Sequence, residues 1–439
     1  MRRSLVGIFL GFLALYHLNG RPHGEVDCVA APFEACALVR HGSLDLRPYP
    51  ELSGLVGFHV RELPDGSWVS ARSPGAAFTA LPVVAPFALL ADPPFGPHGM
   101  LALGKAVASL CVAGSAVLIF LICRRIAPTA AWPTTILFGL GTCLCSVASQ
   151  ALWMHGPATL WLCVALAVLT AERGDRFSWC AAAGFALGVA VLARPSAAFF
   201  AMASGVSLVI ERRWREAAGL ALGGAAPLGL LCVLNCMMFG DPVLGGYAVV
   251  NWEQKPPLWL GLGGLLIAPS RGLFVYSPAL LLAPLGLLVI FRGTTVTLGW
   301  RSESDRWRGT WLAWAIAAGV TVLFYTRWCE WRGGWCYGPR LLCETMPILC
   351  LLFGLGYERL SSGWPRRAAH GLVALSVAVH LIGMFGYGGS LAWQLRHERS
   401  DGGRCLFEMH DTQIEAHAQT IFDQLTGNRV TGRSSCESP

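Results

Sequence analysis

Long apolar runs alternate with short polar segments along almost the whole chain. The runs last roughly 17 to 25 residues, which is the length that an α-helix needs to cross the hydrocarbon core of a bilayer. The pattern therefore predicts an all-α polytopic membrane protein with about eleven transmembrane helices. The predicted spans are 4–18, 101–123, 130–150, 156–172, 177–193, 196–210, 217–238, 272–291, 309–326, 341–357 and 369–388.

One further apolar run, residues 75–94, carries Pro82 and Pro86. If this run crossed the bilayer, every later loop would change sides. Without it, the dense arginine clusters all fall on the same side as the N-terminus, as the positive-inside rule requires. We therefore predict that 75–94 is an interfacial or re-entrant helix, that the N-terminus is cytoplasmic and that the C-terminus is outside. The clusters are Arg124–Arg125, Arg212–Arg213–Arg215, Arg301–Arg306–Arg308 and Arg366–Arg367.

This topology predicts a transmembrane domain over residues 1–388 and a polar outer-face tail over 389–439. A tail of this size is marginal as an independent domain. The other outer segments are the first loop at 19–100 and the loops at 239–271 and 327–340. The predicted location is the plasma (inner) membrane, with the active face periplasmic or extracellular.

The composition agrees with a membrane protein. Hydrophobic residues make up 54% of the chain and charged residues 13%, against about 25% charged in soluble domains. The net charge of +7 comes without a basic run interleaved with aromatics, so nucleic acid is not an expected partner. The 16 cysteines lack zinc-like spacing, and no metal ligands are predicted. Most are expected to be small buried hydrophobes, such as Cys111, Cys143, Cys145, Cys163, Cys180 and Cys232.

Unusual polar residues gather on the predicted outer face, which also holds Glu25 and Asp27. Charge near hydrocarbon is expensive and is usually functional. Arginine suits phosphate because its planar fork binds two oxygens at once, and a phosphate at this depth most naturally belongs to a lipid. The candidate phosphate ligands are Arg194, Arg271, Arg332 and Arg340, and His155, Trp335 and Tyr337 are candidates for the substrate pocket.

Simpler interpretations remain open for several of these residues. Arg340 and Glu344 are spaced i, i+4 and would pair on an α-helix. Arg194 would serve equally well as a residue that snorkels to the headgroups. Aromatic residues at a membrane boundary often form an anchoring belt, and His155 alone is more typical of a structural hydrogen-bonder than of a catalyst.

The order of several motifs resembles the GT-C glycosyltransferases, and most closely the bacterial relatives of the protein mannosyltransferases. The motifs are "LVRHGSLDL", "SARSPGAAFTALPVV", "GFALGVAVLARPSA", "APSRGLFVYSPALLLAPLGL" and "WRGGWCYGPRLLCETMP", and the likeness covers most of residues 1–388. The resemblance implies a sugar donor carried on polyprenyl phosphate, a first outer loop with helices along the membrane, and an acid at the start of that loop as catalytic base. The matching acid is Asp27. Many members have an adjacent Asp-Glu pair, whereas here Glu25 precedes Asp27 and Cys28 follows it, so which acid is the base and whether a divalent cation is used stay open.

The predicted chemistry is an inverting transfer of the sugar to an acceptor hydroxyl on a glycan, a lipid or a protein. Asp27 would take the hydroxyl proton, and an arginine would stabilise the leaving phosphate. Asp27 would serve equally as a helix N-cap, and Glu34 and Asp45 are second-rank acids. The alternatives are a transporter or lipid flippase, which would need polar residues deep in its helices, and a non-catalytic assembly protein. His380 and Asn235 are the main polar residues in helix middles.

Overall fold

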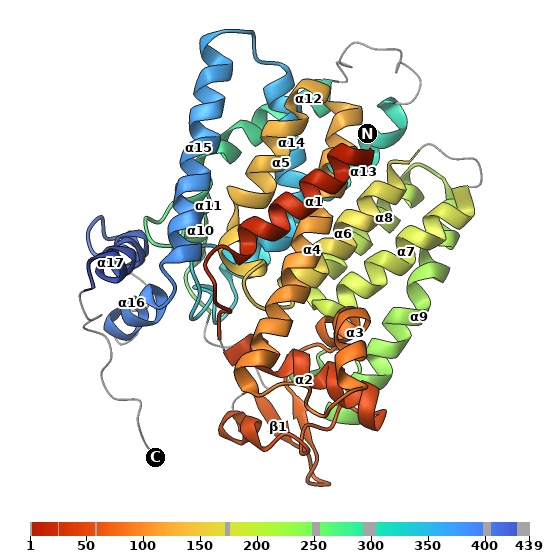
Figure 1. Ribbon diagram of the computed structural model, residues 1–439. Coiled ribbons are helices and arrows are strands. Elements are labelled where there is room, and N and C mark those ends of the chain that lie inside the picture. The colour runs from red at the N-terminus through yellow and green to blue at the C-terminus, as the bar shows by residue number, and fades with distance from the viewer. Residues whose placement is uncertain are drawn as a thin grey trace.

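The computed structural model is a bundle of helices with a compact first loop at one end (Figure 1). It describes residues 2–24, 26–57, 59–171, 176–247, 255–292, 304–397 and 405–427. The polytopic helical fold predicted from the apolar runs is confirmed. The end that carries the first loop is called the loop end below.

Six helices of the described residues are long and apolar enough to cross a membrane. Each coincides with a predicted span. They are α4 (Pro97–Ile126), α7 (Arg176–Ala193), α9 (Trp214–Phe239), α13 (Ser304–Thr326), α14 (Met346–Glu358) preceded by the 3-10 turn η7 (Arg340–Thr345), and α15 (Trp364–Phe385).

The other predicted spans are shorter or broken. Span 130–150 is not one helix, because α5 ends near Gly141 and a π turn follows it. At 15 residues, α6 is only about 22 Å long, so the number of full crossings stays a prediction. These elements are α1 (Arg2–His17), η2 (Pro128–Ala130), α5 (Ala131–Leu140), η3 (Leu144–Ala148), α6 (His155–Leu169), η4 (Pro195–Ala197), α8 (Ala198–Ile210), α11 (Leu273–Tyr276), η6 (Pro278–Leu282) and α12 (Ala283–Arg292).

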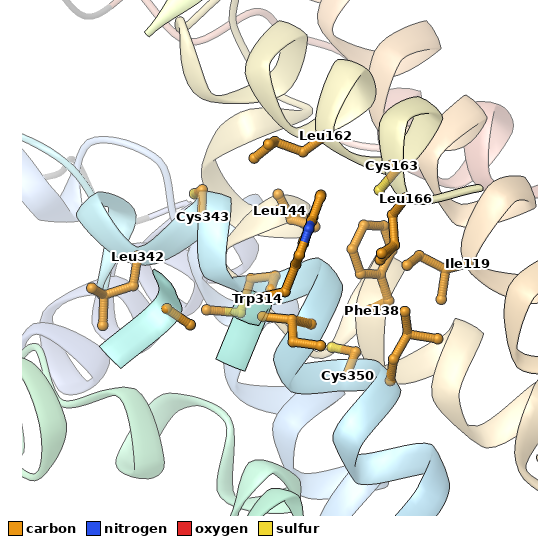
Figure 2. Packing of buried hydrophobic residues seen from close by; sticks show 14 of the residues in the cluster. Ile119, Phe138, Leu144, Leu162, Cys163, Leu166, Trp314, Leu342, Cys343 and Cys350 are labelled. Carbon is orange, nitrogen blue, oxygen red and sulfur yellow. The ribbon is translucent and has the colours of Figure 1, made fainter. Parts of the chain in front are cut away.

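The core lies around α14. Of its apolar window, 89% is buried, against 28% for α9, which lies at the periphery. Figure 2 shows Phe138, Cys163, Trp314 and Cys350 packed together from different helices. Most of the predicted buried cysteines are confirmed, but Cys232 is exposed on α9. Its run was apolar because that face of α9 points away from the protein.

The first loop folds over the loop end of the bundle. Its helix α2 (Val26–His41) packs against α3 (Gly75–Ala88) and α4. Along the chain between α2 and α3, the turn η1 (Pro50–Leu55) is followed by a short antiparallel hairpin of β1 (Val60–Glu62) and β2 (Trp68–Ser70). The expectation that the first loop carries helices is therefore confirmed. Whether α3 lies along the membrane stays a prediction.

The later loop segments and the tail also contain helices. The segment before α11 contains η5 (Gly245–Tyr247) and α10 (Leu258–Leu266). In the tail, α16 (Gly389–His397) and α17 (Gln413–Thr426) lie against each other beside α15 (Figure 1). The tail is thus packed onto the bundle, as expected for a segment too small to fold alone.

Candidate active site

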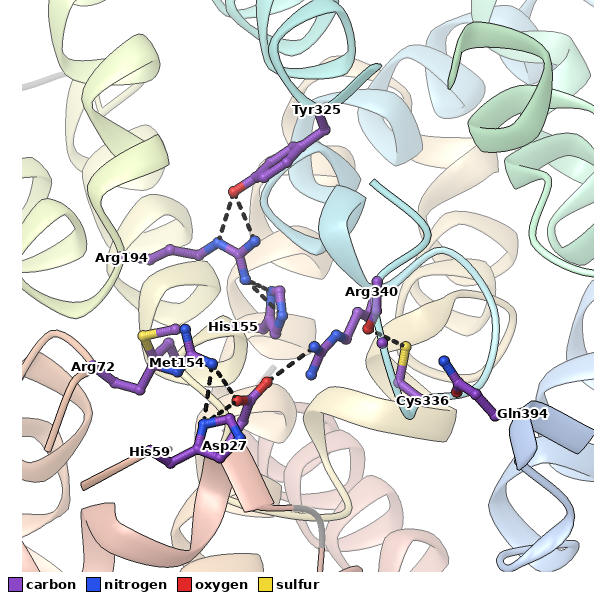
Figure 3. A network of polar contacts seen from close by, with 12 residues as sticks. Asp27, His59, Arg72, Met154, His155, Arg194, Tyr325, Cys336, Arg340 and Gln394 are labelled. Carbon is purple, nitrogen blue, oxygen red and sulfur yellow. Dashed lines mark hydrogen bonds and ion pairs between the residues drawn. The ribbon is translucent and has the colours of Figure 1, made fainter. Parts of the chain in front are cut away.

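Asp27 stands in the first turn of α2, at the loop end of the bundle. Its Oδ1 lies 2.5 Å from the Arg72 guanidinium and 3.0 Å from His59 Nδ1, and its Oδ2 lies 2.9 Å from Arg340 Nη2. These four residues are called the Asp27 cluster (Figure 3). A carboxylate in a first helical turn is favoured by the helix dipole, and here both of its oxygens are also paired with arginine.

The hairpin explains how His59 and Arg72 meet. Val60 pairs with Ser70, and the Ala71 N–H donates to the His59 carbonyl at 2.8 Å. Residues that flank such a pair lie at the same end of a hairpin. His59 and Arg72 were not among the predicted site residues. The turn signal Pro64-Asp65-Gly66, with Gly66 at φ +79°, predicts this hairpin and would have brought them together.

Arg340 reaches the cluster from a glycine-rich loop, residues 333–339. Gly333, Gly334 and Gly338 have φ values of +85°, +61° and +66°, a region that glycine adopts at little cost. The Arg340 guanidinium lies 4.4 Å from the centre of the Trp153 ring, a cation–π contact. These glycines let the loop turn tightly enough for Arg340 to reach Asp27.

Arg340 does not pair with Glu344, although the i, i+4 spacing allowed that interpretation. Residues Arg340–Thr345 form a 3-10 helix, which has about 3.0 residues per turn. Residues four apart therefore point in different directions, whereas on an α-helix they would share a face. Glu344 instead contacts His155 and Arg194.

The Asp27 cluster carries more positive than negative charge. Two guanidinium groups face one carboxylate, which leaves a formal surplus of one positive charge. Burial by itself would raise the pKa of the Asp27 carboxyl, but Arg340, His59 and Arg72 outweigh burial and hold that pKa well below its usual range. Nε of Arg72 and of Arg340 has no hydrogen-bond partner among the described residues. The cluster is therefore an ionised carboxylate with cationic capacity left for an anion.

A second buried network lies next to the cluster. His155 Nδ1 is 2.9 Å and Arg194 Nε is 3.3 Å from Glu344 Oε1, and Arg194 also contacts both ring nitrogens of His155. Arg194 Nη2 donates to the Tyr325 hydroxyl at 2.7 Å, and Arg194 Nε donates to Ser196 Oγ at 3.1 Å. One guanidinium and one carboxylate balance each other, so this Glu344 network is neutral when His155 is neutral.

The two networks adjoin because α3 packs tightly on the end of α7. A Cβ at Gly75 would come within 2.2 Å of the Ala193 backbone nitrogen, so only glycine fits there. Arg72 lies just before Gly75, and Arg194 follows Ala193 directly. This close approach brings both arginines into the group of polar side chains that Figure 3 draws.

The remaining predicted phosphate ligands lie elsewhere. Arg271 is 2% exposed and donates to the Gly334 carbonyl at 2.8 Å and to Cys336 Sγ at 2.9 Å. It lies behind the glycine-rich loop and supports it. Arg332 directly precedes the glycine-rich loop and is half-buried, and no ion pair to it is found among the described residues.

The two predicted aromatic pocket residues differ in exposure. Trp335 is 36% exposed. Tyr337 is buried, and its hydroxyl donates to the Val379 carbonyl at 2.8 Å. In this structure Tyr337 therefore packs the loop onto α15.

The other candidate acids have distinct surroundings. Glu25 lies outside the described residues, so the choice between Glu25 and Asp27 stays open. Asp45 accepts hydrogen bonds from the Arg47 and Trp68 N–H groups at 3.0 and 3.1 Å, so it caps a turn of the first loop. Glu34 is 3% exposed on α2, and burial raises the pKa of its carboxyl to about 8. No group of three or more His, Cys, Asp or Glu side chains within the described part of the chain is placed to hold a metal ion.

Comparison with known proteins gives the fold. No protein-family model and no curated protein matches the chain. Two crystal structures of ArnT from Cupriavidus metallidurans do match in structure, one in the apo state and one bound to undecaprenyl phosphate. ArnT is a GT-C glycosyltransferase.

The chain has an ArnT-like polytopic membrane fold. The TM-scores are 0.52 for the apo and 0.50 for the lipid-bound structure, each at 13% identity. Each match covers 97% of this chain, and it covers 76% and 78% of the two ArnT chains. The GT-C resemblance seen in the sequence is thus supported at the level of the fold. The closer kinship with the protein mannosyltransferases stays a prediction.

Proposed function

We propose that this protein is a GT-C-type glycosyltransferase that moves a sugar from a polyprenyl-phosphate donor to an acceptor hydroxyl at the loop end of the bundle. The observation that carries the proposal is the Asp27 cluster, in which one carboxylate faces two arginines with unused donors. A transferase of this kind needs a base for the hydroxyl and cations for the leaving phosphate. The lipid bilayer supplies the donor, and the loop end faces the outside, as loop charge predicts.

The donor phosphate is held by Arg340 and Arg72 in this proposal. Both are only partly exposed, at 12% and 29% for their side chains, so a bound phosphate is poorly screened by water. Arg194 and Arg271 already use most of their donors on protein groups. Their part is to hold the surrounding segments in place.

The reaction then follows from the charges. The acceptor oxygen attacks the anomeric carbon, the bond from that carbon to the phosphate oxygen breaks, and Asp27 receives the hydroxyl proton. Attack opposite the leaving group inverts the anomeric centre. When Arg340 turns toward the phosphate, an oxygen of Asp27 becomes free and the carboxylate loses part of what holds its pKa down. Donor binding therefore makes Asp27 a better base.

The transporter alternative draws less support from the helix middles. His380 is buried between Ser146 Oγ at 2.9 Å and Ser277 Oγ at 3.1 Å. Asn235 donates to the Pro242 carbonyl at 3.3 Å. The hydrogen-bond partners of both residues are thus uncharged groups. A proton or ion pathway usually pairs such groups with a charge.

Undecaprenyl phosphate binding to the purified full-length protein tests the phosphate site. Arg340→Gln and Arg72→Gln should each weaken binding about tenfold, because each removes a charge-assisted hydrogen bond. Arg47→Gln is the matched control. Arg47 is an exposed arginine of the first loop, which also contains Arg72, and it pairs with Asp45. Its loss should leave affinity unchanged. Equal affinity of the wild-type protein and all three variants would refute the phosphate site.

A further inference from the structure

Side chains of the C-terminal tail contact the glycine-rich loop that leads into Arg340. Gln413 of α17 is fully buried. Its Nε2 donates to the Cys336 carbonyl at 2.6 Å, and its Oε1 accepts from the Gly338 N–H at 2.9 Å. One side chain therefore forms hydrogen bonds with both a carbonyl and an N–H group of the loop. Both contacts lie within four residues of Arg340.

The position of Gln413 is itself fixed. It is the first residue of α17, directly after Thr412, which forms a capping box with Glu415. This capping box sets where the helix begins. The Gln413 N–H also lies 3.3 Å from Ser270 Oγ, and the Tyr276 hydroxyl donates to Gln413 Oε1 at 3.2 Å. Gln413 thus links the tail, the loop and the segment before α11.

Other tail residues support the same loop. His417, one turn further along α17, packs on Tyr337 with ring centroids 4.4 Å apart. Gln394 of α16 lies 3.5 Å from the Arg271 guanidinium, which itself holds the Gly334 carbonyl. The loop needs such support, because a segment with several glycines loses much conformational entropy when it is ordered.

We infer that Gln413 is a positioning residue for glycosyl transfer, and that the C-terminal tail clamps the glycine-rich loop so that Arg340 faces Asp27 and the donor phosphate. This inference rests on the proposed function for the phosphate role of Arg340. The clamp on the loop rests on the contacts of the tail and does not depend on the proposed function. Small displacements of a positioned group have large effects on reactivity, so the clamp matters although it touches no substrate.

The first test compares Gln413→Leu with Gln419→Leu in the full-length protein. Gln419 lies on the same helix but is exposed and bonds only to Asp423 among the described residues. Gln413→Leu should accelerate amide hydrogen exchange in residues 333–340, and Gln419→Leu should not. Unchanged exchange in this loop would overturn the clamp whatever the protein's function.

Undecaprenyl phosphate binding then connects the clamp to Arg340. Gln413→Leu should weaken affinity about tenfold, and combining it with Arg340→Gln should add little, because both changes act through one group. Full additivity, or wild-type affinity for Gln413→Leu, would overturn the positioning role. If exchange accelerates but Arg340→Gln itself leaves affinity unchanged, the proposed phosphate site fails and the clamp on the loop stands.

Gln413→Glu keeps the test decisive if the leucine variant folds poorly. The ionised carboxylate cannot donate to the Cys336 carbonyl, whereas the protonated acid can. Affinity relative to wild type should therefore be reduced at neutral pH. It should recover as pH falls toward about 5, because burial at position 413 raises the pKa of the introduced carboxyl above its usual value of about 4.3. A Gln419→Glu protein should show no such recovery. A Gln413→Glu protein whose relative affinity does not change with pH would contradict the clamp.

Discussion

The Asp27 cluster and the Glu344 network are built from the same residue types, a carboxylate with arginine and histidine, yet they differ in charge balance and burial. The Glu344 carboxylate is fully buried and faces one arginine, Arg194. The side chain of Asp27 is 15% exposed and faces two, Arg72 and Arg340. The Glu344 network balances its charges and is closed to solvent, although Glu344 Oε2 has no hydrogen-bond partner among the described residues. The Asp27 cluster is unbalanced in charge and partly open, so it can accept an anion. From this comparison we propose a structural role for Glu344 and a catalytic role for Asp27.

The largest effect on turnover is expected for Asp27→Asn. The amide has the same shape but cannot accept the hydroxyl proton, so turnover should fall about 10²- to 10⁴-fold. The measurement is the release of polyprenyl phosphate in membranes that contain the donor and acceptor. Undecaprenyl phosphate affinity should not fall, because Arg72 and Arg340 lose a competing carboxylate. Near-normal turnover of Asp27→Asn would move the base to Glu25 or remove the catalytic assignment.

The opposite pattern is expected for Glu344→Gln: a loss of stability without a loss of phosphate binding. Removing one partner of a buried ion pair typically costs about 3–5 kcal/mol, so this protein should lose thermal stability or yield of folded protein. The fraction that folds should bind undecaprenyl phosphate normally. Asp27→Asn, assayed in parallel, should lose much less stability because its cluster reaches water. If Glu344→Gln is stable but inactive, the two regions have been assigned the wrong way round.

The sequence predicted the positions of these residues better than it predicted which of them pair. Apolar run lengths and loop charge placed Asp27, His155, Arg194 and Arg340 at one end of the bundle, because those signals are periodic or additive. The partners were harder to predict. Arg72 and Glu344 meet their partners through irregular backbone, where contact depends on tertiary packing and not on spacing. The alternative pairing of Arg340 with Glu344 is not found, because that i, i+4 spacing falls on a 3-10 turn and not on an α-helix.

The contacts of the tail could not be predicted from its sequence. Its length and polarity indicated only a segment that is marginal as an independent domain. Its contribution comes through one buried amide, Gln413, and through the ring of His417. Single polar residues that bond to a distant backbone leave no periodic signal. Only the fold shows that these two residues lie behind the loop of Arg340.

The smallest effect on activity is expected for Glu34→Gln. Glu34 is a third carboxyl that can be compared with Asp27 and Glu344. Glu34 is buried, and no hydrogen bond or ion pair to it is found among the described residues; burial raises its pKa from 4.5 to about 8. The folded protein therefore keeps a proton that the unfolded chain releases, and stability falls as pH rises from about 4.5 toward about 8, by at most about 1.4 kcal/mol per pH unit. Glu34→Gln should remove this loss: it should match wild type near pH 4.5, exceed its thermal stability increasingly toward pH 8, and transfer sugar at the wild-type rate. A large loss of turnover in this variant would instead make Glu34 a rival to Asp27, and the assignment of chemistry to the Asp27 cluster would have to be revised.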